Sequence, residues 1–236
     1  MNVKYSTNVK SLQKKASKID KELAGLYGEK KQTAKSEPTA ELILTILSQN
    51  TNDTNRDRAY TELRRQFPKW KDVAQAKQTV LARAIKVGGL ADTKAGRIIK
   101  ILRQIKFKSD NYELGFLNEM SDEEVWLYLT SFDGVGPKTA SCVLLFALGR
   151  KAMPVDTHVH RVGQRLGLIP DNFNAEKAHP WFLELNLPVD MYQFHLNLIQ
   201  HGRTACRPRN PKCETCPLKR LCLYYSAMAP GKPHTS

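Results

Sequence analysis

The sequence predicts an all-α protein, and three observations favour that fold class: the helical spacing of apolar residues, a helix-capping pattern and the absence of strand signals. Apolar residues recur at helical spacing along several stretches, and Ser121 followed by Glu124 forms a capping-box pattern ahead of an apolar run. No stretch shows sustained alternation of apolar and polar residues, and no Asn-Gly dipeptide marks a β-hairpin. Helices packed against helices are therefore the expected architecture.

The N-terminal stretch, residues 1–37, is rich in lysine but carries an apolar stripe of its own: Val9, Leu12, Ala16, Ile19, Leu23 and Leu26. This spacing predicts an amphipathic helix docked on the rest of the protein and followed by a polar linker over residues 28–37. A solvated basic arm is the alternative, because blocks of like charge often stay in water.

The next stretches repeat the helical signal. Two further stripes fall at residues 42–47 and 98–105, and the stretch 139–148 again reads as a helix. Residues 227–236 hold two prolines, a glycine and few core residues. We expect this tail to be flexible.

The charge favours a polyanionic partner. Lysine and arginine number 37 against 23 acidic residues, a formal net charge of +14. A polyanion such as nucleic acid suits that excess, although a merely solubilising surface remains an alternative. The apolar stretches are too short to span a bilayer, and the first ten residues do not resemble a signal peptide. We expect an intracellular protein of the cytoplasm or nucleoid, without a membrane partner.

Four of the five cysteines crowd into one short stretch with the spacing Cys206-x6-Cys213-x2-Cys216-x5-Cys222. Thiolates bind zinc and iron–sulfur clusters alike, and a structural zinc site usually uses two C-x2-C pairs, whereas only one is present. A metal centre is favoured over disulfides. Cys142 stands apart on an apolar helix and is read as an inert core thiol.

A turn between two helices holds the next candidate site. One helix should end near Phe132 and another should begin near Pro137, since proline suits a first helical turn. Gly134 and Gly136 allow positive φ and a close backbone approach. Thr139, in the first turn of that second helix, would add an N–H group that favours an anion, and a DNA phosphate fits such a site.

Several motifs together resemble the endonuclease III family of the helix–hairpin–helix DNA glycosylase superfamily, over about residues 38–224. The matching segments are Gly134-Val135-Gly136-Pro137-Lys138-Thr139-Ala140, Val155-Asp156-Thr157-His158-Val159-His160-Arg161-Val162, Leu47-Ser48-Gln49-Asn50-Thr51, Gly89-Leu90 with Lys94-Ala95, His201-Gly202-Arg203 and the cysteine spacing.

The resemblance implies roles for individual residues. Lys138 would be the nucleophile at C1′ of the deoxyribose, for which it needs an uncharged amine, and partial burial would favour that form. Asp156, also a candidate N-cap, would assist departure of the base. Gln49 and Leu90 would fill the space left by an extruded base, although a core leucine is an equal alternative for Leu90.

The same resemblance implies that Cys206, Cys213, Cys216 and Cys222 hold a 4Fe-4S cluster. The loop between the first two cysteines carries Arg207 and Arg209, which suit a DNA backbone. The expected organisation is a six-helix lobe over residues 38–148, a cluster lobe built from 1–37 and 149–224, and a flexible tail over 225–236.

The expected function is a base-excision-repair glycosylase with AP lyase activity that acts as a monomer on duplex DNA containing a damaged base or an abasic site. Oxidised pyrimidines are the default substrate. Residues 50–56 are unusually rich in amides and border the expected base pocket, so a uracil or mismatched-pyrimidine glycosylase stays open. A non-catalytic iron–sulfur protein that binds DNA damage is the alternative from another class.

Overall fold

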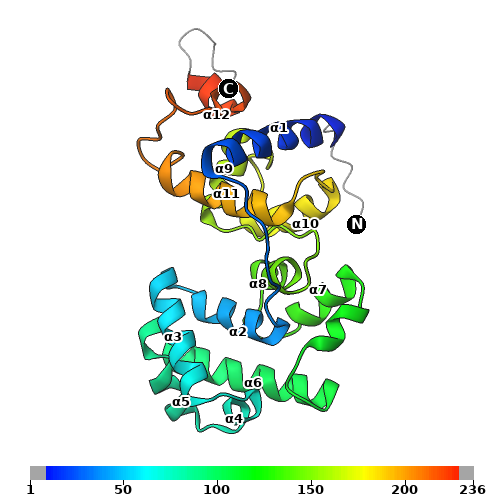
Figure 1. Cartoon of the computed structure of the whole chain (residues 1–236), viewed down its shortest axis with the longest axis vertical. Coiled ribbons are helices and arrows are strands. Elements are labelled where there is room, and N and C mark those ends of the chain that lie inside the picture. The colour runs from blue at the N-terminus through cyan, green and yellow to red at the C-terminus, as the bar shows by residue number, and fades with distance from the viewer. Residues whose placement is uncertain (1–8, 229–236) are drawn as a thin grey trace. The chain divides into compact units, whose positions relative to one another are not determined.

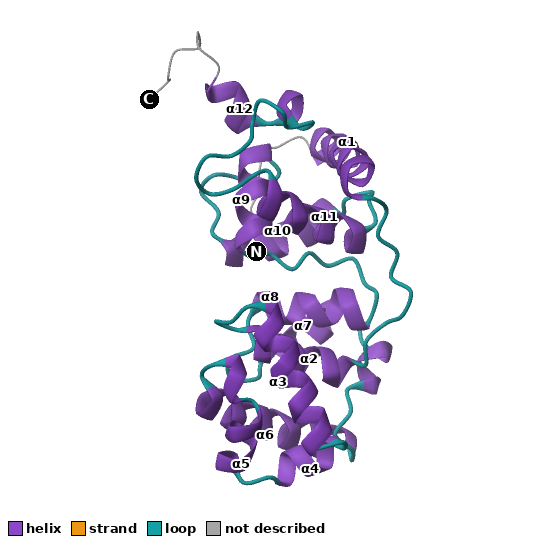
Figure 2. Ribbon diagram, turned by 60° about the vertical axis from the view of Figure 1, so that its left-hand side comes forward, coloured by secondary structure: helices purple, strands orange, loops and turns teal. Residues whose placement is uncertain are grey.

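The computed structural model describes residues 9–228, and every regular element within that range is a helix (Figure 2). The all-α prediction is therefore confirmed. None of the described helices is both long and apolar enough to cross a bilayer. The α-helices labelled in Figure 1 are α1 (Val9–Tyr27), α2 (Pro38–Ser48), α3 (Asp53–Gln66), α4 (Trp70–Gln75), α5 (Gln78–Ala84), α6 (Ala91–Ser109), α7 (Asp122–Thr130), α8 (Pro137–Cys142), α9 (Thr157–Leu166), α10 (Ala175–Leu185), α11 (Met191–Thr204) and α12 (Leu223–Met228).

Shorter turns complete these elements. They are the 3-10 helices η1 (Lys86–Gly88), η2 (Gly115–Glu119) and η4 (Lys219–Leu221), and the π-helical turn η3 (Val143–Ala147) directly after α8. The π turn continues the helix that the sequence predicts over residues 139–148.

The chain divides into two compact units. The continuous stretch Ala34–Arg150, here the hairpin unit, holds α2 to α8. The other, here the cysteine unit, joins the described residues up to Thr33 with those from Lys151 onward, and so contains α1 and α9 to α12. The chain crosses from one unit to the other twice, after Thr33 and after Arg150.

The first helix of the cysteine unit confirms the amphipathic prediction. Its apolar face, Leu12, Ala16, Ile19 and Leu23, is buried, and α1 packs against α10 and α11. The side-chain amide of Gln13 donates to the carbonyl of Leu185 at 2.9 Å. Residues 9–27 are thus a docked helix, and the solvated-arm alternative is wrong for them.

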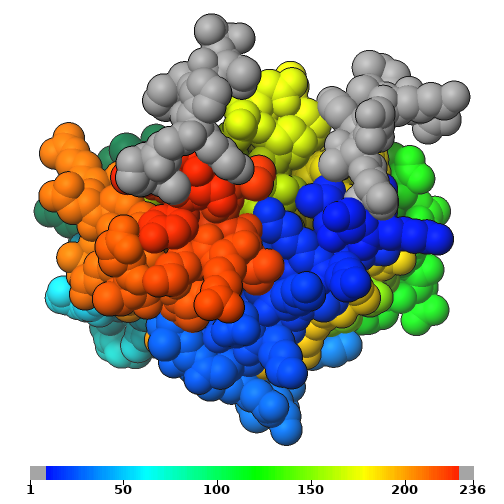
Figure 3. Space-filling view, turned by 90° about the horizontal axis from the view of Figure 1, so that it is seen from above, coloured from blue at the N-terminus to red at the C-terminus, as the bar shows by residue number. Residues whose placement is uncertain are grey.

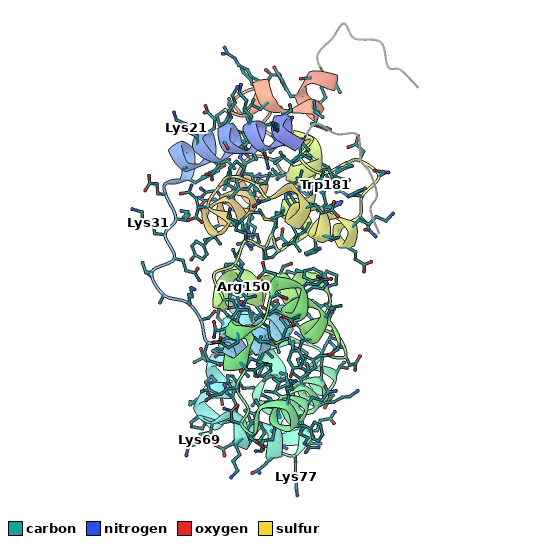
Figure 4. The ribbon with its side chains drawn as sticks, turned by 90° about the vertical axis from the view of Figure 1, so that its right-hand side faces the viewer. Lys21, Lys31, Lys69, Lys77, Arg150 and Trp181 are labelled. Atoms are coloured by element: carbon teal, nitrogen blue, oxygen red, sulfur yellow. The ribbon has the colours of Figure 1, made fainter. Side chains whose placement is uncertain are left out.

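The core of the cysteine unit includes Trp181 on α10 (Figure 4). Its indole N–H donates to the carbonyl of Leu168 at 2.8 Å, and its ring meets that of Phe173 edge to face at 5.8 Å between centroids. The buried indole is therefore satisfied, and α10 is tied to the segment that follows α9.

The C-terminal segment ends in a helix. Helix α12 begins at Leu223, so helical structure extends past residue 224, where the sequence predicts the tail to begin. Residues 229–236 lie outside the described range. The segment, orange to red in Figure 3, lies beside the blue surface of α1.

Helix α2 is the central element of the hairpin unit and packs against α3, α6 and α8 (Figure 1). Glu37 caps its N-terminus by accepting hydrogen bonds from the backbone N–H groups of Thr39 and Ala40, and Pro38 occupies the first helical position. Its apolar residues are buried almost all round, including Leu42, Ile43, Ile46 and Leu47.

The hairpin unit, which is described throughout, has seven α-helices rather than the six expected. The additional boundary falls at residues 76–77, which separate the short helices α4 and α5. The capping box before α7 is confirmed, since Ser121 Oγ accepts from Glu124 N and Glu124 Oε2 accepts from Ser121 N.

Candidate functional site

The turn between α7 and α8 places Lys138 at the second residue of α8. Gly134 has φ +72°, which permits the reversal of the chain, and Pro137 begins the helix. Lys138 is exposed. The partial burial expected from the sequence is therefore absent, because α8 starts at the surface of the hairpin unit and only its later residues enter the core.

The N-terminus of α8 is open. Gly136 is its N-cap, so no side chain caps the first N–H groups, and a Cβ at Gly136 would meet nothing within 4 Å. The chain's own packing thus leaves room there for an external acceptor. Thr139 is only 4% exposed, which leaves its backbone rather than its hydroxyl for a phosphate contact.

The first hairpin glycine, Gly134, makes an internal contact. A Cβ at Gly134 would come within 2.0 Å of the Arg97 guanidinium, so that cation occupies the space of the missing side chain. The carbonyl of Gly134 accepts from Gln49 Nε2 at 3.1 Å, and Gln49 Oε1 accepts from Arg97 Nη1 at 2.9 Å. The amide of Gln49, expected to insert into DNA, thus bonds within the hairpin unit.

Asn50 follows Gln49 in one of the segments that carry the resemblance, but the sequence analysis assigned it no role of its own. It is exposed and has φ +53°, a left-handed conformation that asparagine tolerates better than most residues. Its carbonyl lies 4.0 Å from the position of a Cβ on Gly89. Asn50 therefore presents a free polar side chain beside the loop that carries Leu90.

Leu90 is 56% exposed and has φ +49°. An exposed leucine with a left-handed backbone is unusual, and such strain collects at functional positions. The core-leucine alternative is wrong, because the Gly89-Leu90 turn directs this residue outward before α6 begins.

Lys94 is buried inside the hairpin unit, with 1% exposure. Its ammonium donates to the carbonyl oxygens of Leu47 and Gly88, each at 2.8 Å, and burial lowers the pKa of this amine. The sequence contained a usable signal, since Lys94 lies four residues before Ile98 and so falls in the apolar stripe of α6.

Asp156 is the N-cap of α9 in the cysteine unit. Its Oδ1 accepts from the backbone N–H groups of His158 at 2.9 Å and Val159 at 2.7 Å. The carboxylate is half-buried, with its orientation fixed by these two bonds. The capping role that the sequence predicts is present.

The clustered cysteines surround one pocket. Cys206, Cys213, Cys216 and Cys222 all line it, together with His201 and Arg165, and none forms a disulfide. Burial, followed by the neighbouring thiolates, raises the pKa of the Cys213 and Cys216 thiols. Four thiolates that repel one another across a pocket suit a cationic iron–sulfur core, which stabilises the deprotonated ligands.

Helix α9 braces the cysteine loop. Arg161 Nε donates to the carbonyl of Cys206 at 3.1 Å, and Arg165 Nη1 donates to the carbonyl of Arg207 at 2.8 Å. Arg207 and Arg209 both expose their side chains. The loop therefore exposes two cationic side chains on a backbone that Arg161 and Arg165 hold in place.

The residues singled out by the sequence fall into two groups. The hairpin unit holds Gln49, Leu90, Gly134, Gly136, Lys138 and Thr139. The cysteine unit holds Asp156, Arg207, Arg209 and the four clustered cysteines, whereas Cys142 is buried in the hairpin unit. Sequence reasoning assigned no individual role to Asn50 and missed the bonding roles of Lys94 and Arg97.

Two family models match the chain. The model of the HhH-GPD superfamily of base excision DNA repair proteins matches residues 43–184. The model of the iron–sulfur binding domain of endonuclease III matches residues 206–222, which contain all four clustered cysteines.

Similar proteins and structures agree with these matches. Endonuclease III of Thermotoga maritima is 34% identical over 198 residues, covering 84% of this chain and 88% of that protein. A candidate DNA glycosylase of Arabidopsis thaliana is 41% identical over 165 residues, or 69% of this chain, and the chain spans 55% of that protein. A solved non-covalent endonuclease III–DNA complex matches with a TM-score of 0.74 and 25% identity, covering 91% of this chain and 97% of that one.

Proposed function

The chain belongs to the endonuclease III family of the HhH-GPD base excision DNA repair superfamily, a family of DNA glycosylases with AP lyase activity, and we propose that it acts on oxidised pyrimidines in duplex DNA. Lys138 is the proposed nucleophile and Asp156 the proposed assisting carboxylate. One chain supplies every group in this proposal, so a monomer suffices. It would work on cellular DNA in the cytoplasm or nucleoid.

Lys138 carries the proposal because it is exposed and follows an N-terminus that no side chain caps. In the proposed reaction its neutral amine attacks C1′, the C1′–N bond breaks, and the electron pair leaves with the base, which is then protonated. The amine then loses its protons and the C1′–O4′ bond breaks, with O4′ leaving as a hydroxyl, so that Nζ and C1′ form a Schiff base. The Schiff base withdraws electrons and allows loss of a C2′ proton. The C3′–O bond then breaks and the phosphate departs by β-elimination, before water releases the lysine.

Asp156 would stabilise the positive charge that develops on the sugar as the base leaves. The bonds from His158 N and Val159 N hold the carboxylate in one orientation without neutralising its charge. A fixed anion of this kind needs little reorganisation during the reaction.

The proposed DNA contacts follow from exposure. The open start of α8 would bind a phosphate through backbone N–H groups, with Gly134 and Gly136 permitting the approach. Arg207 and Arg209 would add charged contacts to the backbone. Leu90 would enter the duplex as an apolar wedge, and Gln49, or Asn50 beside it, would face the unpaired partner base.

The protein carries a 4Fe-4S cluster, as its match to the iron–sulfur domain of endonuclease III indicates. We assign the four clustered cysteines as its ligands because they line one pocket. When bound, the cluster would supply cross-linking of the C-terminal segment rather than electron transfer, since breaking a glycosidic bond requires no redox step. Arg161 and Arg165 would then fix the loop that carries Arg207 and Arg209.

A strand-cleavage assay with borohydride trapping tests this function. The substrates are matched duplexes with thymine glycol, uracil, a G·T mismatch or a preformed abasic site. Cleavage and trapping with thymine glycol would support the proposal. Activity on uracil or the mismatch alone would favour the alternative pyrimidine glycosylase, and binding without any trapping would favour a non-catalytic damage-binding protein.

A further inference from the structure

Two cations near the start of α6 connect, directly or through Gln49, the three segments of the hairpin unit that are proposed to meet DNA. These segments are the pivot loop (residues 47–50), the wedge loop (residues 88–90) and the hairpin (residues 132–136). Lys94 and Arg97 stand three residues apart, so both project from one side of α6. All of these groups belong to the hairpin unit.

Lys94 joins the pivot loop to the wedge loop. Its ammonium donates to Leu47 O at the end of α2 and to Gly88 O at the end of η1, each at 2.8 Å. Carbonyls at helix ends lack partners within their own helix, and a cation satisfies them well. Since this lysine is 1% exposed, water cannot replace the bonds.

Arg97 joins the hairpin to the pivot loop. Its Nη1 donates to Gln49 Oε1, and Gln49 Nε2 donates in turn to Gly134 O. The guanidinium lies where a side chain on residue 134 would stand, so the glycine is needed for this contact as well as for its positive φ. The hairpin, the pivot loop and the wedge loop are thereby connected through one helix.

We propose that Lys94 and Arg97 are positioning residues that hold these three segments as one rigid DNA-reading surface. This inference rests on the proposed function. Insertion of a wedge residue must offset the free-energy cost of unstacking the extruded base. A mobile loop would lose part of the binding free energy because it must become ordered on binding. Leu90 also needs surrounding structure to maintain its left-handed backbone. Lys94 anchors the residue two positions before Leu90, and Arg97, through Gln49, links the pivot loop to the hairpin.

A double-mutant cycle tests the coupling. Single-turnover base excision would be compared for wild type, Lys94→Met, Leu90→Ala and the double variant, with Lys108→Met as the matched control. Lys108 is an exposed lysine on the same helix. We expect Lys94→Met to slow excision about tenfold, Lys108→Met to change it less than about twofold, and the double variant to be no more than about twofold slower than Leu90→Ala. Rates that multiply across the cycle would overturn the proposal.

A second readout does not depend on catalysis. Fluorescence of 2-aminopurine opposite an abasic site reports unstacking on binding, and Lys94→Met should lose most of the wild-type increase. An unchanged increase would contradict the inference even if wild type were catalytically inactive, so the two proposals fail separately. Should Lys94→Met not fold, Arg97→Met takes its place in both experiments, because Arg97 is only half-buried.

Discussion

Arg165 on α9 donates from Nη1 to Sγ of Cys206 at 3.3 Å. The same guanidinium bonds the carbonyls of Arg207 and Pro208, and Asp156 caps the other end of the helix. One short helix thus connects the proposed assisting carboxylate with the proposed cluster ligand. Substitution of the cysteines should therefore also perturb the start of α9, where Asp156 lies.

The cysteine stretch gives the first prediction. Purified protein should be yellow-brown and contain about four irons per chain, as a four-cysteine cubane requires. Cys213→Ala should lower the iron content and the melting temperature, because the C-terminal segment loses its cross-link. Cys142→Ala is the control and should keep its iron. Metal analysis showing stoichiometric zinc in a colourless protein would exclude the cluster.

Substitution of the proposed nucleophile gives the second prediction. Lys138→Gln should abolish borohydride trapping and strand cleavage while leaving duplex affinity within a fewfold of wild type, because the open helix N-terminus remains. Lys69→Gln, at an exposed position of the same unit (Figure 4), controls for the lost charge. Wild-type cleavage of abasic DNA by Lys138→Gln would show that another amine attacks.

Asp156 allows its two roles to be separated. Asparagine also caps helices, so Asp156→Asn should retain stability, whereas Asp156→Ala should lose about 1 kcal/mol. Both variants should slow base excision by at least about tenfold, because both remove the negative charge. Thermal melts and single-turnover rates measure the two effects, and rapid excision by Asp156→Asn would leave only the capping role.

Leu90 should show opposite effects on stability and activity. Leu90→Gly relieves the left-handed strain and should stabilise the protein by up to about 1 kcal/mol, while removing the wedge should slow excision. Asn186→Gly is the control, since Asn186 also has positive φ but lies in the cysteine unit. That control should leave excision unchanged. Loss of stability in Leu90→Gly would show that Leu90 contributes packing instead.

Glu41 should make stability depend on pH. Burial raises the pKa of this carboxyl, partly offset by hydrogen bonds from Ser36 and Thr45 and by the charges of Arg56 and Lys138. With its pKa above the unfolded value, folding favours the protonated form, so this stabilisation is complete at low pH and is lost as pH rises through the folded pKa. Glu41→Gln should therefore raise the melting temperature more at pH 8 than at pH 4.5. An equal shift at both values would assign the effect to packing.

Patterns local to the sequence predicted much of the fold. The stripe of α1 and the capping box at Ser121 depend on residues three or four positions apart, and both are present. The helix–turn–helix around Gly134 followed from glycine and proline stereochemistry. These features need little information from the rest of the chain.

Hydrogen bonds to acceptors that lie far away in the sequence could not be predicted from such local patterns. The partners of Lys94 are a carbonyl 47 residues away and one in the adjoining turn, and those carbonyls become available only where helices end. Likewise Gln49 reaches Gly134 across 85 positions. The left-handed backbone of Leu90 could not be predicted either, because it runs against the local preference of leucine.

Because the cysteine unit is built from two separate stretches of the chain, the order of synthesis affects the order in which the two units can fold. The hairpin unit is continuous, so it can fold as soon as its own residues leave the ribosome. Helix α1 precedes the hairpin unit in the chain, yet its packing partners α10 and α11 begin only at Ala175 and Met191, so its apolar face is covered only after the hairpin unit has been made. The four cysteines emerge later still. The proposed cluster ligands therefore come after the whole hairpin unit in the chain, so the hairpin unit can be complete before the cysteines are available to bind iron.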